Sequence, residues 1–312
     1  MDRIQLIPEY GEVERLLFSF VHEFYNTRFG YGRVIAEICD CLKEVVEIEA
    51  FCATDDSPHL EEEFAAVGLS SSTVRIMHPG PPEGALNTFM PVFGSIGGRL
   101  QGLTFPYLPE DTEYRPASKA CEEFARRFLA ERGIPEVRLP FEFGTARIAA
   151  NSEIALVSSV HASNMHWFDQ HMEQRCYSVP FIEDEPTKDL DVFLIPVADS
   201  TWLVSDFPES TAAHIAMRQT VDVLTAAHQE IDHLPGLKSI RRDDVNCLPN
   251  YANALLVNGH AIVPQFGVAE DEIALAVYRN HGFTAHGIDA RQVVESNAIF
   301  HCMAKTLGNP QD

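Results

Sequence analysis

The sequence has few basic residues. Lysine and arginine number 23 against 46 aspartates and glutamates, which gives the 312-residue chain a formal net charge of −23. Such a field repels a phosphate backbone and an anionic membrane surface, so neither nucleic acid nor a membrane is expected as a partner. A cationic small molecule is favoured by the same field, although many proteins are acidic for solubility alone. The charge therefore permits a cationic substrate without requiring one.

Long apolar runs are absent as well. No stretch approaches 18 uninterrupted apolar residues, and the first ten residues are charged and lack the apolar region of a signal peptide. The seven cysteines are an odd number without a framework spacing, so we expect them to be reduced. These absences predict a cytoplasmic protein.

Motifs for phosphate, metal and serine chemistry are also missing. The glycines between Gly94 and Arg99 lack a following lysine and a strand-to-helix context, and no Gly-x-Ser-x-Gly elbow occurs. Cys39 and Cys41 fall two apart in a helical pattern, where they point to different faces and cannot share a zinc ion. The spacing of three histidines fits neither a helical nor a strand pair: His161, His166 and His171. No metal and no cofactor is expected.

The apolar periodicity nevertheless predicts an ordered α/β chain. Helical spacing covers Gly11 to Val46, in two helices, and short strands and loops are expected over residues 47 to 114. Further helices and hairpins follow from the period and the turn residues: helices Ala117 to Arg132 with Gly133 after it, His214 to Glu230 and Asp271 to His281; a strand Glu153 to Ser159; hairpins Val192 to Val204 and Ala252 to Phe266, the latter with an Asn258-Gly259 turn.

No low-complexity linker interrupts this alternation of strand pairs and helices. One continuous α/β domain over residues 1–312 is therefore favoured. A loose recurrence of strand, turn, strand and helix is visible at a few tens of residues, but by itself it does not define a repeat architecture.

Two C-terminal segments carry a family resemblance. Residues 250–267, NYANALLVNGHAIVPQFG, and residues 287–306, which contain GIDAR and AIFHCMAKT, follow one another in the order seen in the agmatine deiminases and bacterial-type peptidylarginine deiminases of the guanidino-modifying (pentein) superfamily. In that family the cysteine of the His-Cys motif is the nucleophile. The resemblance implies this role for Cys302.

Upstream, the resemblance is accompanied by substitutions. Residues 189–194 resemble the family's His-x-Asp strand, so Asp191 takes the place of the substrate-gripping aspartate and Asp189 that of the acid/base histidine. Residues 87–91 resemble an Arg-Asp-x-x-Pro segment, with Thr88 where the second gripping aspartate is expected. Residues 142–145 resemble a Glu-Gly-Gly-Asn segment that begins at Glu142.

The resemblance implies a five-bladed α/β propeller with pseudo-fivefold repeats, an open doubly wound α/β sheet being the alternative. It also implies a cysteine-dependent hydrolase or transferase acting on the C–N bond of a guanidine or amidine such as agmatine or arginine. The substitutions leave two alternatives: an altered enzyme that uses another small molecule, and a non-catalytic protein on the same scaffold. A homo-oligomer is compatible with each.

The residues themselves set conditions on catalysis. Asp189 and Asp191 lie two apart on an expected strand, so they share a face, and the charge of one raises the pKa of the other. Asp189 is then a candidate proton donor. Cys302 is alternatively a small buried apolar side chain. His301, next to it on a strand, is expected to point away, which leaves His260 as a conceivable substitute base.

Overall fold

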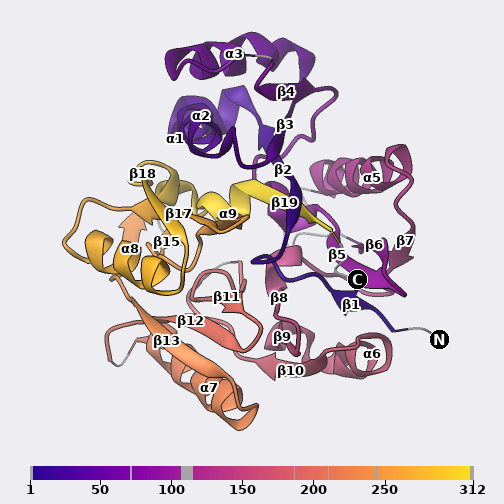
Figure 1. Ribbon diagram of the computed structural model, residues 1–312, viewed down its shortest axis with the longest axis vertical. Coiled ribbons are helices and arrows are strands. Elements are labelled where there is room, and N and C mark those ends of the chain that lie inside the picture. Colours follow the sequence, from indigo (N-terminus) through magenta and orange to yellow (C-terminus); the bar gives the residue numbers. More distant parts are fainter. Residues whose placement is uncertain are drawn as a thin grey trace.

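The computed structural model of the chain describes residues 3–70, 72–106, 115–185, 187–209, 211–242 and 245–309. Their strands form six small sheets of two to four strands, and no single open sheet is found among these residues. Helices surround the strands in Figure 1, where α2, α5, α6, α7 and α8 lie around the outside of a ring.

Five modules make up this ring, and each has the same topology. Two strands pair antiparallel, a helix follows, and a third strand returns parallel to the second. In four modules the order follows the chain: β5(Val92–Ile96), β6(Arg99–Thr104), α5(Arg115–Glu131), β7(Glu136–Arg138); β8(Ile148–Ala150), β9(Ile154–Ser158), α6(Met165–His171), β10(Arg175–Val179); β11(Leu194–Ala198), β12(Thr201–Asp206), α7(Ala212–Ala226), β13(Glu230–Pro235); β16(Leu255–Val257), β17(His260–Gln265), α8(Glu270–Asn280), β18(Thr284–Asp289).

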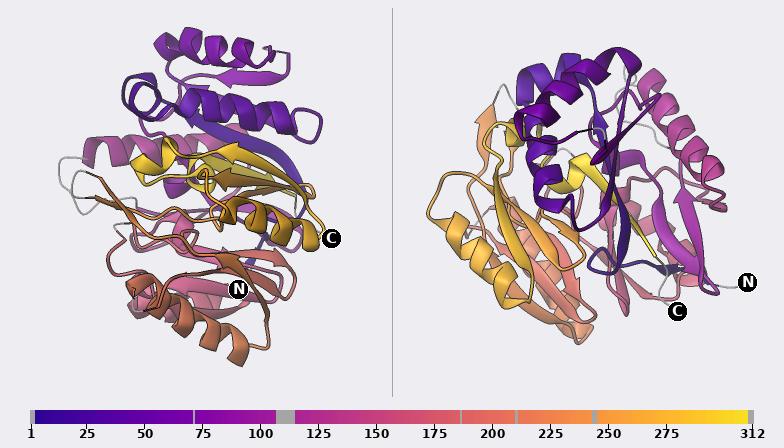
Figure 2. Two further views of the ribbon diagram at one scale, coloured as in Figure 1. Left: turned by 90° about the vertical axis from the view of Figure 1, so that its left-hand side faces the viewer. Right: turned by 45° about the horizontal axis from the view of Figure 1, so that its top comes forward.

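The remaining module joins the two ends of the chain. Its first strand is β19(Ala304–Gly308), which pairs antiparallel with β2(Val13–Phe20); α2(Tyr31–Leu42) then leads to β3(Glu47–Cys52). A further helix α3(Ser57–Ala66) and strand β4(Val74–Met77) extend it, and α3 lies outermost at the top of Figure 1 and of the left view in Figure 2. The shorter elements are β1(Gln5–Leu6), α1(Thr27–Phe29), α4(Leu86–Phe89), β14(Ile240–Arg242), β15(Val245–Cys247) and α9(Phe300–Met303).

The repeated strand-helix module around one centre confirms the predicted pentein architecture. The Asn258-Gly259 hairpin is also confirmed: both residues have positive φ, 48° and 79°, as a type I′ turn requires. The helix predicted over Ala117 to Arg132 is present as α5, and Gly133 follows it at a φ of 64°.

Two predicted elements are wrong. The first predicted helix, within Gly11 to Val46, is the strand β2, which lies between β19 and β3 and is buried along Leu16–Phe20. A strand covered on both faces is continuously apolar, and periodicity cannot distinguish it from a buried helix. The second is α3, a helix within residues 47 to 114, where only short strands and loops were expected; its Pro58 occupies a first-turn position that needs no N–H donor.

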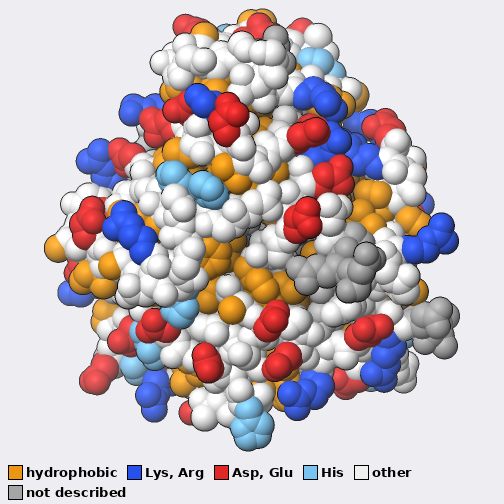
Figure 3. Space-filling view, in the orientation of Figure 1, with side chains coloured by type: hydrophobic (Ala, Val, Ile, Leu, Met, Phe, Trp, Pro, Cys, Tyr) orange, Lys and Arg blue, Asp and Glu red, His pale blue; other side chains and the backbone are white. Residues whose placement is uncertain are grey.

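Acidic side chains are dispersed over the face shown in Figure 3 and do not gather in one patch. None of the helices in the described ranges has both the length and the apolar character needed to cross a membrane.

Candidate functional site

Cys302 lies in α9, a single helical turn that directly precedes β19. Its side chain is 8% exposed. Asn253 organises this turn, because its Oδ1 accepts the backbone N–H of His301 at 2.9 Å and that of Cys302 at 3.4 Å. The Nδ2 of Asn253 also donates to the Sγ of Cys302 at 3.3 Å. The side-chain amide of Asn253 therefore hydrogen-bonds both to the backbone of the turn and to the sulfur.

Asp191 is the carboxylate nearest this sulfur. The thiol donates a hydrogen bond to its Oδ2 at 3.5 Å. The other oxygen, Oδ1, is buried and has no hydrogen-bond partner in the described part of the chain. An unsatisfied buried carboxylate oxygen leaves one strong acceptor available to an N–H donor. Burial and the charges of Asp191 and Asp189 hold the pKa of the Cys302 thiol well above its usual value.

Asp191 and Asp189 do not lie on a strand, as the sequence suggested, but in an irregular segment before β11. Asp189 is 5% exposed, and its Oδ1 lies 3.6 Å from the Nε of Arg147. Burial, reinforced by the charges of Asp191 and Glu185 and opposed by Arg147, raises the pKa of Asp189 well above its usual value.

His301 occupies a different place from the one predicted. Because α9 is helical, the ring is not directed away from the site: its Nδ1 lies 2.7 Å from Asp191 Oδ2, and its Nε2 lies 2.5 Å from Glu9 Oε2. Burial opposes protonation of the ring, but the two carboxylates prevail and raise its pKa to about 10. His301 is thus an imidazolium and not a free base. His260, in contrast, pairs with His286 at 3.0 Å.

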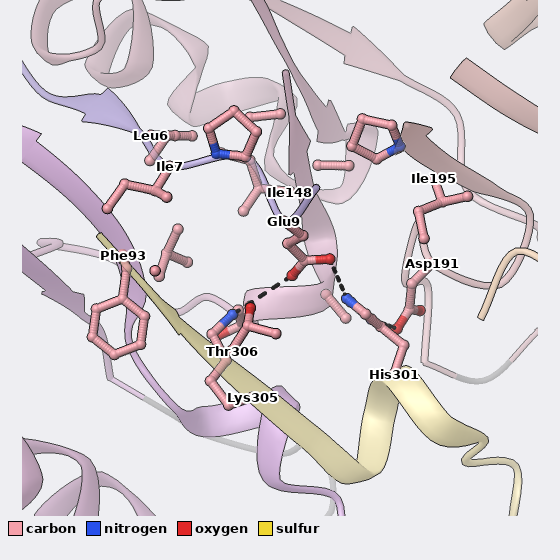
Figure 4. A pocket seen from close by; sticks show the side chains of 18 of the residues that line it. Leu6, Ile7, Glu9, Phe93, Ile148, Asp191, Ile195, His301, Lys305 and Thr306 are labelled. Atoms are coloured by element: carbon pink, nitrogen blue, oxygen red, sulfur yellow. Dashed lines mark hydrogen bonds and ion pairs between the residues drawn. The ribbon is translucent and has the colours of Figure 1, made fainter. Parts of the chain in front are cut away.

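A cavity of about 60 Å³ adjoins this ion pair, and Figure 4 shows its lining. Glu9, Asp191, His301 and Lys305 supply its charged groups, and most of the other lining residues are apolar. Lys305 donates to the side-chain oxygen of Asn87 at 3.0 Å and lies 3.9 Å from Glu9. The volume is sufficient for water molecules, which need about 10–15 Å³ each on this measure.

Two predicted site residues are less closely tied to the sulfur. Thr88 is half-buried in α4, a helix that packs against α9. Glu142 is exposed in the segment after β7, outside the buried group of charges. Three buried or half-buried members of that group were missed: Glu9, Arg147 and Glu185. Each lies far from Cys302 in the sequence or outside the quoted motifs, so only the fold brings them together. No group of three or more histidine, cysteine or acidic side chains in the described ranges is arranged to hold a metal ion.

A scan against protein-family models matches residues 146–307 to the Porphyromonas-type peptidyl-arginine deiminase family. The chain belongs to this family. The match spans β8 to β19 and includes Asp189, Asp191, Asn253 and Cys302. A search of curated proteins found no significant match.

Solved structures of related enzymes share the fold over nearly the whole chain. An agmatine deiminase of C. jejuni is 17% identical, with a TM-score of 0.83 over 99% of this chain and 98% of that one. An agmatine deiminase of Enterococcus faecalis is 14% identical, with a TM-score of 0.80 over 99% and 96%. An amidinotransferase of Microseira wollei is 14% identical, with a TM-score of 0.57 over 99% of both chains. These similarities confirm the pentein fold.

Proposed function

We propose that the protein is a cysteine-dependent hydrolase, or a related transferase, that acts on the C–N bond of a guanidine or amidine such as agmatine or arginine. The observation that carries this proposal is the contact between the Cys302 thiol and Asp191, whose second oxygen has no hydrogen-bond partner among the residues that the structure describes. A guanidinium has N–H donors on the edge next to its central carbon, so pairing one edge with Asp191 brings that carbon to the sulfur. We further propose that residues 1–312 act as one catalytic domain, because the contributing residues range from Glu9 to Lys305.

A cationic substrate also affects the ionisation of the thiol. The thiol is disfavoured as a thiolate by burial and by two nearby carboxylates. A bound guanidinium adds a positive charge beside the sulfur, which lowers the pKa of the thiol and favours the nucleophile when the substrate is present.

The reaction then proceeds in two substitutions. The Cys302 thiolate attacks the central carbon, an S–C bond forms, and the C–N bond to one amino group breaks as that nitrogen takes a proton and leaves as ammonia. Asp189 is the proposed proton donor, since its buried carboxyl group retains its proton to higher pH than usual. Asp189 next removes a proton from water, the hydroxide attacks the same carbon, and the S–C bond breaks. The O–H proton of the adduct is released as the carbonyl forms, and ammonia takes it up. The products are therefore a urea derivative, ammonium and the regenerated thiolate.

The test is ammonia release together with a ureido product from agmatine and from arginine, followed in the wild type, Cys302→Ala and Asp189→Asn. Both variants should lose turnover while retaining the thermal unfolding transition. The double variant Thr88→Asp with Asp189→His restores the family's residue types at these two positions. It should release ammonia faster than Thr88→Asp alone or Asp189→His alone. Turnover that persists in Cys302→Ala would overturn the proposal.

One observation favours a second candidate, an altered enzyme of the same scaffold. Arg147 places a guanidinium of the chain itself 3.6 Å from Asp189, in a site that would otherwise receive one from the substrate. If a folded wild type and the double variant are both inert on agmatine and arginine, but Cys302 still reacts with a small electrophile, a different substrate is indicated. An inert thiol would indicate a non-catalytic protein.

A further inference from the structure

A continuous series of short contacts leads away from the Cys302 thiol on the side of Asp191. The sulfur lies 3.5 Å from Asp191 Oδ2, and the same oxygen lies 2.7 Å from Nδ1 of His301. The other ring nitrogen lies 2.5 Å from Glu9 Oε2, at the cavity of Figure 4. The series joins residues from the N-terminal segment, the loop before β11 and α9.

The charges along this series alternate in sign. Glu9 and Asp191 are carboxylates on either side of the His301 ring, and Lys305 lies beside Glu9 at 3.9 Å. The net charge of these two carboxylates, the imidazolium and the ammonium group is zero. The other titratable groups near the thiol are Asp189, which lies beside Arg147, and Tyr31.

We propose that His301 and Glu9 are positioning residues that control, through Asp191, the ionisation of the Cys302 thiol. This inference deepens the proposed function, on which it rests for the nucleophilic role of Cys302. Neither side chain is hydrogen-bonded to the sulfur in the described residues: His301 acts on the carboxylate of Asp191, which contacts the sulfur, and Glu9 acts on His301.

The sign of the effect follows from electrostatics. The carboxylate of Asp191 beside the sulfur opposes a thiolate, and the imidazolium on its far side offsets that field. Removing the positive charge of His301 leaves Asp191 uncompensated, so the thiol ionises at higher pH. Glu9 acts one step further back: its charge is the largest contribution that keeps His301 protonated, so without it the ring loses its proton at lower pH.

The experiment is the pH dependence of Cys302 alkylation by iodoacetamide, quantified for the Cys302 peptide by mass spectrometry. In His301→Gln the rise in rate with pH should move upward by about one unit, which is about tenfold slower alkylation at a fixed pH below the midpoint. Glu9→Gln should shift it in the same direction by less. His171→Gln and Glu12→Gln are matched controls, since His171 is only half-buried and Glu12 is exposed, and both should keep the wild-type profile.

A structural role alone would change the amount of folded protein without moving the midpoint. Unmoved midpoints in folded His301→Gln and Glu9→Gln would overturn the inference. If either variant does not fold, histidine-labelled wild type decides the matter by NMR: the ring of His301 should remain protonated at pH 8.5, and a His301 midpoint below that pH would overturn the inference. Iodoacetamide needs no guanidine turnover, so this result does not depend on whether agmatine or arginine is a substrate.

Discussion

Replacing Asp189 by asparagine should stabilise the protein at neutral pH while it abolishes turnover. The pKa of this carboxyl group is raised by burial and by Asp191 and Glu185. Between the ordinary value of 3.8 and the raised value, the folded protein retains a proton that the unfolded chain has released. Folding stability contributed by this group therefore falls as pH rises through that window, by up to about 1.4 kcal/mol per pH unit. A carboxamide has no such dependence, and it retains the shape of the side chain.

The assay is urea unfolding of the wild type and Asp189→Asn at several pH values from 4 to 8. The free energy of unfolding of the variant minus that of the wild type should increase as pH rises from about 4. The slope of the free energy against urea concentration should be the same for both proteins. Asp184→Asn is the matched control, because Asp184 is an exposed aspartate five residues away. A stability difference that stays constant with pH, or an Asp189→Asn variant whose relative stability falls as pH rises, would refute the assignment of a buried, protonated Asp189.

Further outcomes are expected at other positions. Cys302→Ala should lower ammonia release by about a thousandfold or more in a steady-state assay, with the fold retained by circular dichroism. Asn253→Ala removes the amide that donates to the sulfur and should slow Cys302 alkylation at pH 8 by about tenfold. Glu49 is 1% exposed and pairs with Arg15 at 2.8 Å. The substitution Glu49→Gln should therefore lower the free energy of unfolding by about 1–3 kcal/mol, measured by urea unfolding. The raised pKa of His301 predicts stability that is fully present below pH 6.5 and lost as pH rises through about 10, which urea unfolding of wild type against His301→Gln would measure.

Individual turns were predictable where the chain carries residues that tolerate a positive φ. Asn258-Gly259 and Gly133 each require a conformation that few residues adopt, and both turns are where the sequence placed them. The strand β2 was not predictable, because burial on both faces removes the alternation that distinguishes a strand. A segment in which every residue is apolar has no periodicity, so its pattern cannot distinguish a strand from a helix.

The site was predictable only as far as local motifs reach. Cys302 and Asp191 were found from quoted segments, and the structure brings them into contact. The position of His301 depended on whether residues 300–303 form a strand or a helical turn, and four residues carry too little periodicity to decide. Glu9 could not be assigned to the site, since its contact with His301 spans 292 residues and arises from closure of the ring.

Pairing of β19 with β2 has a consequence for synthesis of the protein. The strands β2 and β3 of this module precede the other four modules in the sequence, but its edge strand β19 follows them. Until β19 emerges, one edge of β2 lacks its hydrogen-bonding partner, and exposed strand edges promote association with other chains. The same late event delivers the thiol to Asp191 and the imidazole to Glu9. A growing polypeptide should thus expose the edge of β2, and lack the contact between Cys302 and Asp191, until β19 has been synthesised.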